Sequence, residues 1–429
     1  MVALYTRIAV WLCILTLVAC REPSDPGALI RLSFAARGVE PPHTVVVNPN
    51  AEGKAIAATI HQAIEMVAPG GMVLVKPGTY AEALVIDKGL TLEAIGDGLE
   101  PVIVAPPGSV NAAILVATSE RVTIRGLTVQ YTGVRGIFGN GVVDVTIERT
   151  SVVAVNPPLG VSALISIPND APTTGRARAV VRESFLDGSL PPANSPTPAF
   201  PQIFGITVAG DIDARLEGNV IRRTGGACIF VIMNNNLGGE TNADVVGNDL
   251  DECYPLGRAG SILVGPRAGF LPSPTQPVTA TGEVDIVGNT IRSSSGSCLV
   301  TSAIVYETFT GRIERNRILG AAPPCATPGA RNFPGAIWVG SLPARGFPRV
   351  NVTVRFNDIE GNAHAGLRVG PNETAPGLQA SCNWWGSASG PSGAGPGTGD
   401  AVVVETPAAT PMFTPWATGP IAETHATSC

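Results

Sequence analysis

Ionisable side chains that could carry out chemistry are sparse in this chain. Asp and Glu number 34, Lys and Arg 28 and His 4 in 429 residues, and the charged fraction of 14% is well below the roughly 25% of an average globular domain. Asp211, Glu307 and Arg368 are the candidates for proton transfer, since each lies in or just after a short apolar segment. A solvated turn is the alternative interpretation for both acids, because Asp and similar polar residues are common in turns.

Metal and cofactor motifs are not evident. The four histidines form no HxH or HxxxH pair, and the cysteines form no CxxC pair, which argues against a structural zinc site. Calcium would use Asp211 and Asp213, yet no DxDxDG loop accompanies them. GxSxG and P-loop motifs are absent as well. We therefore expect no metal and no cofactor.

Overall composition favours short strands joined by turns. Hydrophobic residues make up 45% of the chain but aromatic residues only 5%, and there are 50 Gly and 38 Pro, which is typical of an aliphatic core in an all-β fold. The net charge is −6, and the three lysines, Lys54, Lys76 and Lys88, all lie near the N-terminus. No broad basic surface is available for phosphates, so nucleic-acid binding is not expected.

Residues 1–20 read as an export signal. Arg7 precedes an apolar run too short to span a membrane, and the run ends at Leu17-Val-Ala-Cys20, which resembles the bacterial lipobox. The resemblance implies lipidation of Cys20 and a lipid anchor in a bacterial membrane, and Arg21 after the cysteine favours the outer membrane. An unlipidated signal peptide is the alternative. The proline-containing segment 21–45 would be a tether.

A repeated element predicts the fold. The pattern apolar-x-x-Asn-x-apolar recurs around Asn219, Asn248, Asn289, Asn316 and Asn357, and successive copies, including weaker ones upstream, are 23 to 41 residues apart. A second short strand precedes each copy, and strands stacked turn on turn form a single-stranded right-handed parallel β-helix, a solenoid that we place at 46–429 with about ten coils. The asparagines would occupy the bend between strands, since Asn tolerates left-handed backbone geometry and stacked amides bond along the axis.

The spacing of six cysteines agrees with an oxidising compartment. Sequence neighbours pair Cys228 with Cys253, Cys298 with Cys325 and Cys382 with Cys429, and the first two separations are close to one coil. Six cysteines allow fifteen pairings in principle.

Both ends of the solenoid have capping signals. An apolar face over 56–67 predicts an N-terminal helical cap, and the following Val73-Leu-Val-Lys-Pro-Gly-Thr-Tyr80 resembles the opening of pectin-lyase-like β-helix proteins. Asn383-Trp384-Trp385-Gly386 and Phe413-Thr-Pro-Trp416 resemble the terminal cap of bacterial surface proteins with right-handed β-helix repeats. The two tryptophans are expected to close the last coil, with a sugar platform as the alternative. The resemblance implies the fold but no single activity.

An aromatic outer face predicts a ligand. The resemblance implies binding of polysaccharide along an outward sheet face, where Phe138, Phe230 and Trp338 would lie, with Phe270, Arg345 and Phe347 on inserted loops. Solvated loops without a shared site are the alternative. No outward position of these strands is Asp, Glu or Lys, which favours binding of polysaccharide or another surface ligand without catalysis. The alternative is a polysaccharide lyase or hydrolase, in which the resemblance implies Arg368 as base with Asp211 or Glu307.

Overall fold

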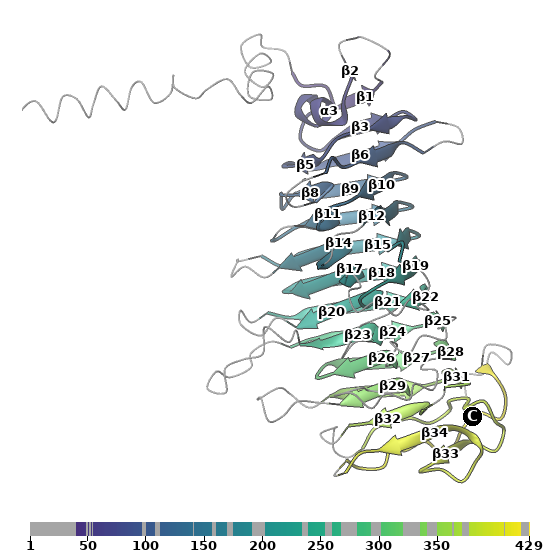
Figure 1. Ribbon diagram of the computed structural model, residues 1–429. Coiled ribbons are helices and arrows are strands. Elements are labelled where there is room, and N and C mark those ends of the chain that lie inside the picture. Colours follow the sequence, from purple (N-terminus) through teal and green to yellow (C-terminus); the bar gives the residue numbers. More distant parts are fainter. Residues whose placement is uncertain are drawn as a thin grey trace, which may run out of the picture.

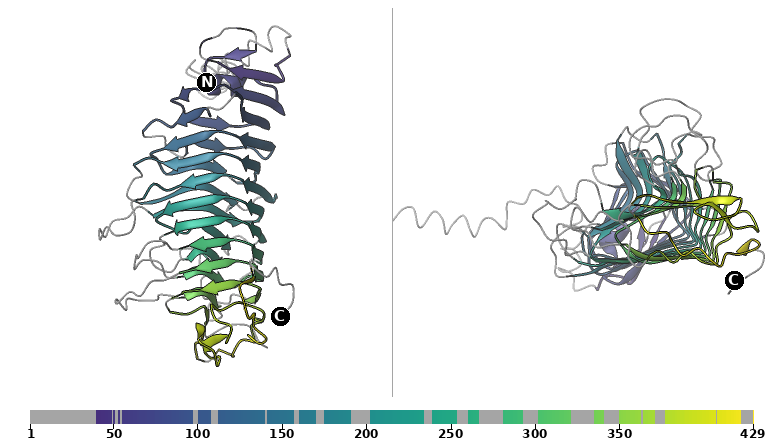
Figure 2. Two further views of the ribbon diagram at one scale, coloured as in Figure 1. Left: turned by 90° about the vertical axis from the view of Figure 1, so that its right-hand side faces the viewer. Right: turned by 90° about the horizontal axis from the view of Figure 1, so that it is seen from below.

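The computed structural model shows a right-handed parallel β-helix, as predicted (Figure 1). It describes residues 40–429 except 49, 51–52, 54, 97–99, 108–111, 140, 157–159, 170–174, 191–201, 234–238, 254–259, 267–280, 293–301, 321–334, 341–349, 363, 371–376, 407 and 422–428. Each coil contributes one strand to each of three parallel sheets, which enclose a triangular interior when seen along the axis (Figure 2). Ten consecutive coils run from β3 to β32 in the described part of the chain, in agreement with the expected number.

Sheet A contains the strand that leads into each asparagine. Its members are β1 (Thr44–Val47), β2 (Ile56–Ala57), β3 (Gly71–Val75), β6 (Leu90–Ala94), β9 (Arg121–Arg125), β12 (Asp144–Glu148), β15 (Ala177–Arg182), β18 (Ile212–Glu217), β21 (Thr241–Val246), β24 (Glu283–Val287), β27 (Thr310–Glu314) and β30 (Asn351–Arg355).

Sheets B and C complete each coil. Sheet B contains β4 (Thr79–Tyr80), β7 (Val102–Val104), β10 (Thr128–Tyr131), β13 (Ser151–Ala154), β16 (Phe185–Asp187), β19 (Val220–Thr224), β22 (Asp249–Cys253), β25 (Thr290–Arg292), β28 (Arg317–Leu319) and β31 (Asp358–Glu360). Sheet C contains β5 (Leu84–Ile86), β8 (Ile114–Val116), β11 (Arg135–Gly139), β14 (Val161–Asn169), β17 (Gln202–Gly210), β20 (Ile229–Met233), β23 (Gly260–Pro266), β26 (Ser302–Glu307), β29 (Gly335–Gly340), β32 (Leu367–Val369), β33 (Pro391–Gly393) and β34 (Gly399–Val404).

The interior is built from the leading apolar position of each repeat. These residues are in register from one sheet A strand to the next, and all are fully buried. Because side chains alternate across a strand, the residues on either side of each apolar position point outward and are free to be polar. The stacked positions are Ile124, Ile147, Val181, Leu216, Val245, Ile286, Ile313 and Val354.

The predicted asparagine ladder is confirmed at the corner between sheets A and B. In each rung Nδ2 donates to Oδ1 of the next asparagine, at 2.9 Å from Asn219 to Asn248 and 2.9 Å from Asn248 to Asn289, and the ladder continues through Asn316 and Asn357 to Asn383. The predicted left-handed geometry of the asparagines is wrong.

Left-handed backbone geometry belongs instead to the residue before each asparagine. Gly218 has φ +62° and Gly247 φ +63°, because the chain turns at this position before the asparagine side chain points inward. Glycine adopts this conformation without steric cost. The asparagines are therefore selected for their amides, which satisfy buried backbone groups at the corner.

The N-terminal cap is shorter than predicted. Helix α3 spans Ile60–Met66, and Ile56 lies in strand β2. Thr59 ends the strand-like segment as N-cap, where its hydroxyl accepts a hydrogen bond from the Gln62 amide. Strand β1 begins at Thr44, so residues 44 and 45 belong to sheet A. In the described residues, no helix has the length and apolar character needed to cross a bilayer.

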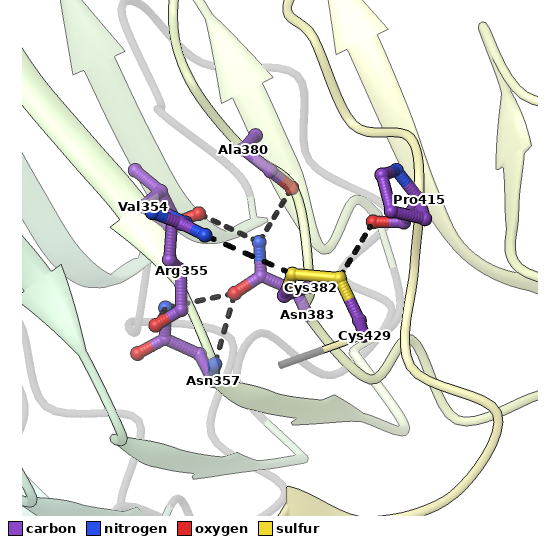
Figure 3. The surroundings of a disulfide bond; sticks show 8 residues. All are labelled: Val354, Arg355, Asn357, Ala380, Cys382, Asn383, Pro415 and Cys429. Atoms are coloured by element: carbon purple, nitrogen blue, oxygen red, sulfur yellow. Dashed lines mark hydrogen bonds between the residues drawn. A yellow bond between two sulfur atoms is a disulfide. The ribbon is translucent and has the colours of Figure 1, made fainter. Parts of the chain in front are cut away.

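The C-terminal cap closes the last coil. Trp385 is fully buried in the core, as expected, whereas Trp384 is half-buried. Disulfide Cys382–Cys429 joins the chain terminus to the last rung of the asparagine ladder (Figure 3), and Cys228–Cys253 links two neighbouring segments 25 residues apart. Both predicted pairings are confirmed, and the pairing of Cys298 with Cys325 lies outside the described residues.

Candidate functional site

The outer face of sheet C carries the predicted aromatic residues, but two of the rings are covered. Phe138 is half-buried beneath the Arg135 guanidinium, 4.2 Å from the ring centroid. Phe230 is 9% exposed and lies 5.6 Å from Phe204, and Trp338 is 3% exposed. These two rings therefore do not present an open platform. Phe270, Arg345 and Phe347 lie outside the described residues, as does Cys20.

The three catalytic candidates are on different coils. Asp211 follows β17, Glu307 ends β26 and Arg368 lies in β32. Neighbouring strands in a sheet are about 4.8 Å apart, so Glu307 is three rungs or about 14 Å from the coil of Asp211 and two rungs or about 10 Å from that of Arg368. Arg368 donates from Nη1 to Oε1 of Glu405 at 3.0 Å. The structure does not bring these candidates together.

Glu307 has the most unusual environment of the three. Its side chain is on the outer face of sheet C and only 7% of the residue is exposed, so the interpretation as a solvated turn residue is wrong. A Cβ at Gly265 would stand 2.7 Å from Glu307 Oε2, which shows that the carboxyl lies over this bare position. Within the described part of the chain the carboxyl has no hydrogen bond or ion pair. Burial raises its pKa to about 7.

Backbone geometry next to Glu307 is strained. Thr308 has φ +63°, a left-handed conformation that is rare for a β-branched residue. Its amide donates to the carbonyl of Gly340 at 3.3 Å. Strain of this kind is often concentrated at functional positions, and here it lies next to a carboxyl whose pKa is raised to near neutrality.

Arg176 occupies the place between the carboxylates considered for calcium. Its guanidinium donates to Asp213 Oδ1 at 2.6 Å and to Glu240 Oε2 at 2.9 Å, and Nη1 lies 3.4 Å from Asp211 Oδ1. Asp213 belongs to strand β18 rather than to a turn. Among the residues that the structure describes, no three His, Cys, Asp or Glu side chains are grouped as metal ligands would be.

A polar hollow lies on the outer face of sheet A, which sequence reasoning missed. It has a volume of about 220 Å³ and spans strands β18, β21 and β24, which lie one below another in Figure 1. The register places Asp213 beside Asn242, and Asp244 beside Asp285. Glu283 starts the third strand, where its amide donates to Asn242 Oδ1 at 3.1 Å. Ala214 and Ala243 complete the lining.

Arginines flank this hollow and hold its aspartates in place. Arg215 Nη1 lies 3.3 Å from Asp244 Oδ2, and Arg312 Nε donates to Asp285 Oδ2 at 2.7 Å. The hydrogen bond that the Arg312 guanidinium donates to Asp285 raises the pKa of Arg312 above its ordinary value. Glu283 differs from the aspartates, because its carboxylate has no hydrogen bond or ion pair within the described residues.

The sequence does contain a signal for the hollow. Three successive repeats carry polar residues at the outward positions before the asparagine, as in Asp213-Ala-Arg215, Asn242-Ala-Asp244 and Glu283-Val-Asp285. The outward positions considered for a ligand from the sequence belong to sheet C, whereas the hollow lies on sheet A. Because all strands of a sheet are in register, polar residues at equivalent positions of consecutive repeats form one surface.

Comparisons with known proteins give structural likeness at low identity. No family model and no curated protein matches the sequence. The A-module of the Azotobacter vinelandii mannuronan C-5 epimerase AlgE6 is 16% identical, with a TM-score of 0.47 over 83% of this chain and 93% of that one. A rhamnogalacturonan lyase is 12% identical, with a TM-score of 0.44 over 79% and 87%. The catalytic unit of a GH87 α-1,3-glucanase from Streptomyces thermodiastaticus is 15% identical, with a TM-score of 0.40 over 88% and 70%.

Proposed function

We propose that this chain binds a polysaccharide, and that the ligand contacts the polar hollow on the outer face of sheet A. The observation that carries the proposal is the lining of that hollow, in which four carboxylates and one amide from three consecutive coils surround one depression. Carboxylates accept and amides both donate and accept hydrogen bonds. Such a set matches the hydroxyl groups of a sugar, each of which can donate and accept.

The architecture suits a repeating ligand. Successive rungs present equivalent outward positions about 4.8 Å apart along the axis, so a glycan lying along the solenoid would meet similar groups again and again. Ion pairs with Arg215 and Arg312 hold Asp244 and Asp285 in fixed positions, which reduces the conformational entropy lost on binding. Among the described residues none donates to the Glu283 carboxylate, which can therefore accept hydrogen bonds from hydroxyl groups of a ligand.

A panel of neutral and acidic glycans tests this proposal. The purified mature chain should bind at least one glycan, and Glu283→Gln combined with Asn242→Ala should weaken that binding about 30-fold or more, since two or three hydrogen bonds are lost. Glu360→Gln is the matched control, because Glu360 is an exposed carboxylate on sheet B. Equal weakening by both variants, or no binding across the panel, would refute the assignment of the hollow.

A second candidate function is catalysis by Glu307. Its favouring observation is the buried carboxyl beside the strained Thr308, with a pKa of about 7, close to the value that suits a general acid or base at neutral pH. The reaction would be cleavage of a glycan by a lyase or hydrolase. Turnover of a glycan by the wild type that Glu307→Gln abolishes, with the fold intact, would establish it, and no turnover across the panel would exclude it for the glycans tested.

We propose further that the chain is exported and anchored through a lipid on Cys20, in a bacterial membrane that Arg21 indicates to be the outer one. The support is the lipobox-like sequence at residues 17–20 and the two disulfides in the folded part, which need an oxidising compartment. Expressed in a Gram-negative host, the wild type should sediment with membranes and Cys20→Ala should become soluble. A soluble wild-type protein would contradict the anchor.

A further inference from the structure

An arginine cluster surrounds Phe356 at the corner between sheets A and B in the last two coils. We call Arg315, Arg317, Arg355 and Phe356 the basic corner. The guanidinium carbons of Arg315 and Arg355 lie 5.4 Å and 5.0 Å from the centroid of the Phe356 ring. Arg355 also approaches the terminal disulfide, with Nη2 3.9 Å from Cys382 Sγ (Figure 3). Arg315 and Arg317 are exposed and Arg355 is half-buried.

The backbone makes this cluster costly to keep. Arg315 and Phe356 occupy the left-handed position before the ladder asparagine, with φ +57° and +55°. The three preceding coils have Gly218, Gly247 and Gly288 at this position, and glycine relieves the strain that other residues suffer there. Arg315 and Phe356 therefore occupy positions where glycine would be less strained and would favour the stability of the fold.

The described residues around the basic corner do not neutralise its positive charge. None of the three arginines has an ion pair within the described part of the chain. Two acidic side chains of the same coils are already engaged, since Glu314 lies 3.7 Å from Arg312 and the buried Asp358 accepts a hydrogen bond from the Ile421 amide. Glu360, the next outward acid on sheet B, is two residues beyond Asp358 along the strand. The chain as a whole has a net charge of −6, so the corner is a local exception.

We infer that the basic corner binds a polysaccharide that carries carboxylate or sulfate groups. A guanidinium recognises either anion through two parallel hydrogen bonds, and Arg315 and Arg317 come from the same coil while Arg355 comes from the next. Trp384 supports this surface from below, because it packs against the cluster that contains Phe356 and pairs with Asp358 in a β-bridge. The site is separate from the hollow on sheet A and does not depend on the proposed function.

A glycan fits the basic corner better than a lipid headgroup does. The corner lies at the C-terminal end of the solenoid, while the chain enters at the opposite end (Figure 1). Eight rungs separate β3 from β27, a distance of about 38 Å. The expected tether of residues 21–45 therefore joins the solenoid at the end away from the basic corner.

Matched probes test the inference. Carboxymethyl-dextran and uncharged dextran share one backbone, so their comparison measures the contribution of the anionic groups. The mature chain should bind carboxymethyl-dextran and not dextran, and Arg315→Gln with Arg317→Gln should weaken binding about tenfold. Arg121→Gln with Arg178→Gln is the control, because it removes the same charge from exposed arginines of sheet A that lie six and four rungs from β27, and it should change affinity less than twofold.

Other results of these measurements would contradict the inference, or would show that it stands independently of the proposed function. Unchanged binding by the Arg315 and Arg317 variant, or equal binding of dextran, contradicts it. Vesicles of phosphatidylglycerol and phosphatidylcholine that bind while carboxymethyl-dextran does not would assign the corner to lipid instead. If the double variant unfolds, Arg317→Gln alone decides, because Arg317 has an ordinary backbone conformation. Glu283→Gln should leave binding at the corner unchanged, so failure of the hollow does not affect this test.

Discussion

Replacement of one ladder asparagine should destabilise the whole solenoid. Asn289 is fully buried in the middle of the ladder. Its Nδ2 donates to Asn316 Oδ1 at 3.0 Å and to the carbonyl of Val245 at 2.8 Å, while its Oδ1 accepts from the backbone and side-chain nitrogens of Asn248, both at 2.9 Å. Asn289→Ala removes all four bonds and leaves their partners buried.

The size of the effect follows from these four bonds. A typical buried hydrogen bond contributes about 1 kcal/mol net, and each partner left unsatisfied costs more, so Asn289→Ala should lower the free energy of unfolding by about 4 kcal/mol. Asn351→Ala removes an amide from the exposed start of β30 and should cost less than about 0.5 kcal/mol.

Urea denaturation followed by far-ultraviolet circular dichroism measures both values. The transition midpoint of Asn289→Ala should fall well below that of the wild type, and that of Asn351→Ala should coincide with it. A loss below about 1 kcal/mol for Asn289→Ala would mean that the ladder satisfies groups that water can satisfy equally well. The buried amides would then not be what stabilises the solenoid.

Three further predictions concern charge and covalent links. Because burial raises the pKa of Glu307 to about 7, the wild type should lose about 3 kcal/mol of stability as pH rises from about 4.5 through 7, and Glu307→Gln should abolish this loss in denaturation curves measured across pH. Desolvation raises the pKa of Glu148, but hydrogen bonds from Arg182 and Arg125 outweigh it and hold the pKa below its ordinary value. Glu148→Gln should therefore lower the free energy of unfolding at pH 7 by only about 1–2 kcal/mol, because the arginine partners of Glu148 are partly exposed. This cost should shrink as pH falls below about 4.5 and Glu148 becomes protonated; an equal cost at pH 3 would refute this. Replacing the disulfide Cys228–Cys253 with two alanines should lower the free energy of unfolding by about 3 kcal/mol, and reductant should then have a smaller effect on the thermal midpoint.

The architecture was predictable because equivalent residues make equivalent contacts in every copy of the repeat. Ile286 and Ile313 occupy equivalent places in two copies of the same pattern, and the structure stacks them in register. Asn289 lies at the same place in each coil, so its structural role could be inferred from recurrence alone. The backbone geometry of the corner could not be inferred in this way, since the sequence pattern does not show which residue of the corner has positive φ. That residue is Gly288, directly before the asparagine.

The candidate sites were harder to predict because they depend on which outward-facing side chains remain accessible to solvent in the folded chain. Trp338 reads as an exposed aromatic residue from its alternation with Ile337 and Val339, yet it is buried. Glu307 reads as a turn residue, but it ends strand β26 and is buried. Asp244 and Asp285 are 41 residues apart in sequence and become neighbours only through the register of sheet A.

A crystal structure of the mature chain with the glycan that binds most tightly in the panel tests the central claim most directly. We expect an ordered sugar over strands β18, β21 and β24, with hydroxyl groups within hydrogen-bond distance of Glu283 and Asn242. An ordered sugar on the outer face of sheet C beside Glu307, with the hollow on sheet A occupied only by water, would contradict it and would favour the catalytic alternative.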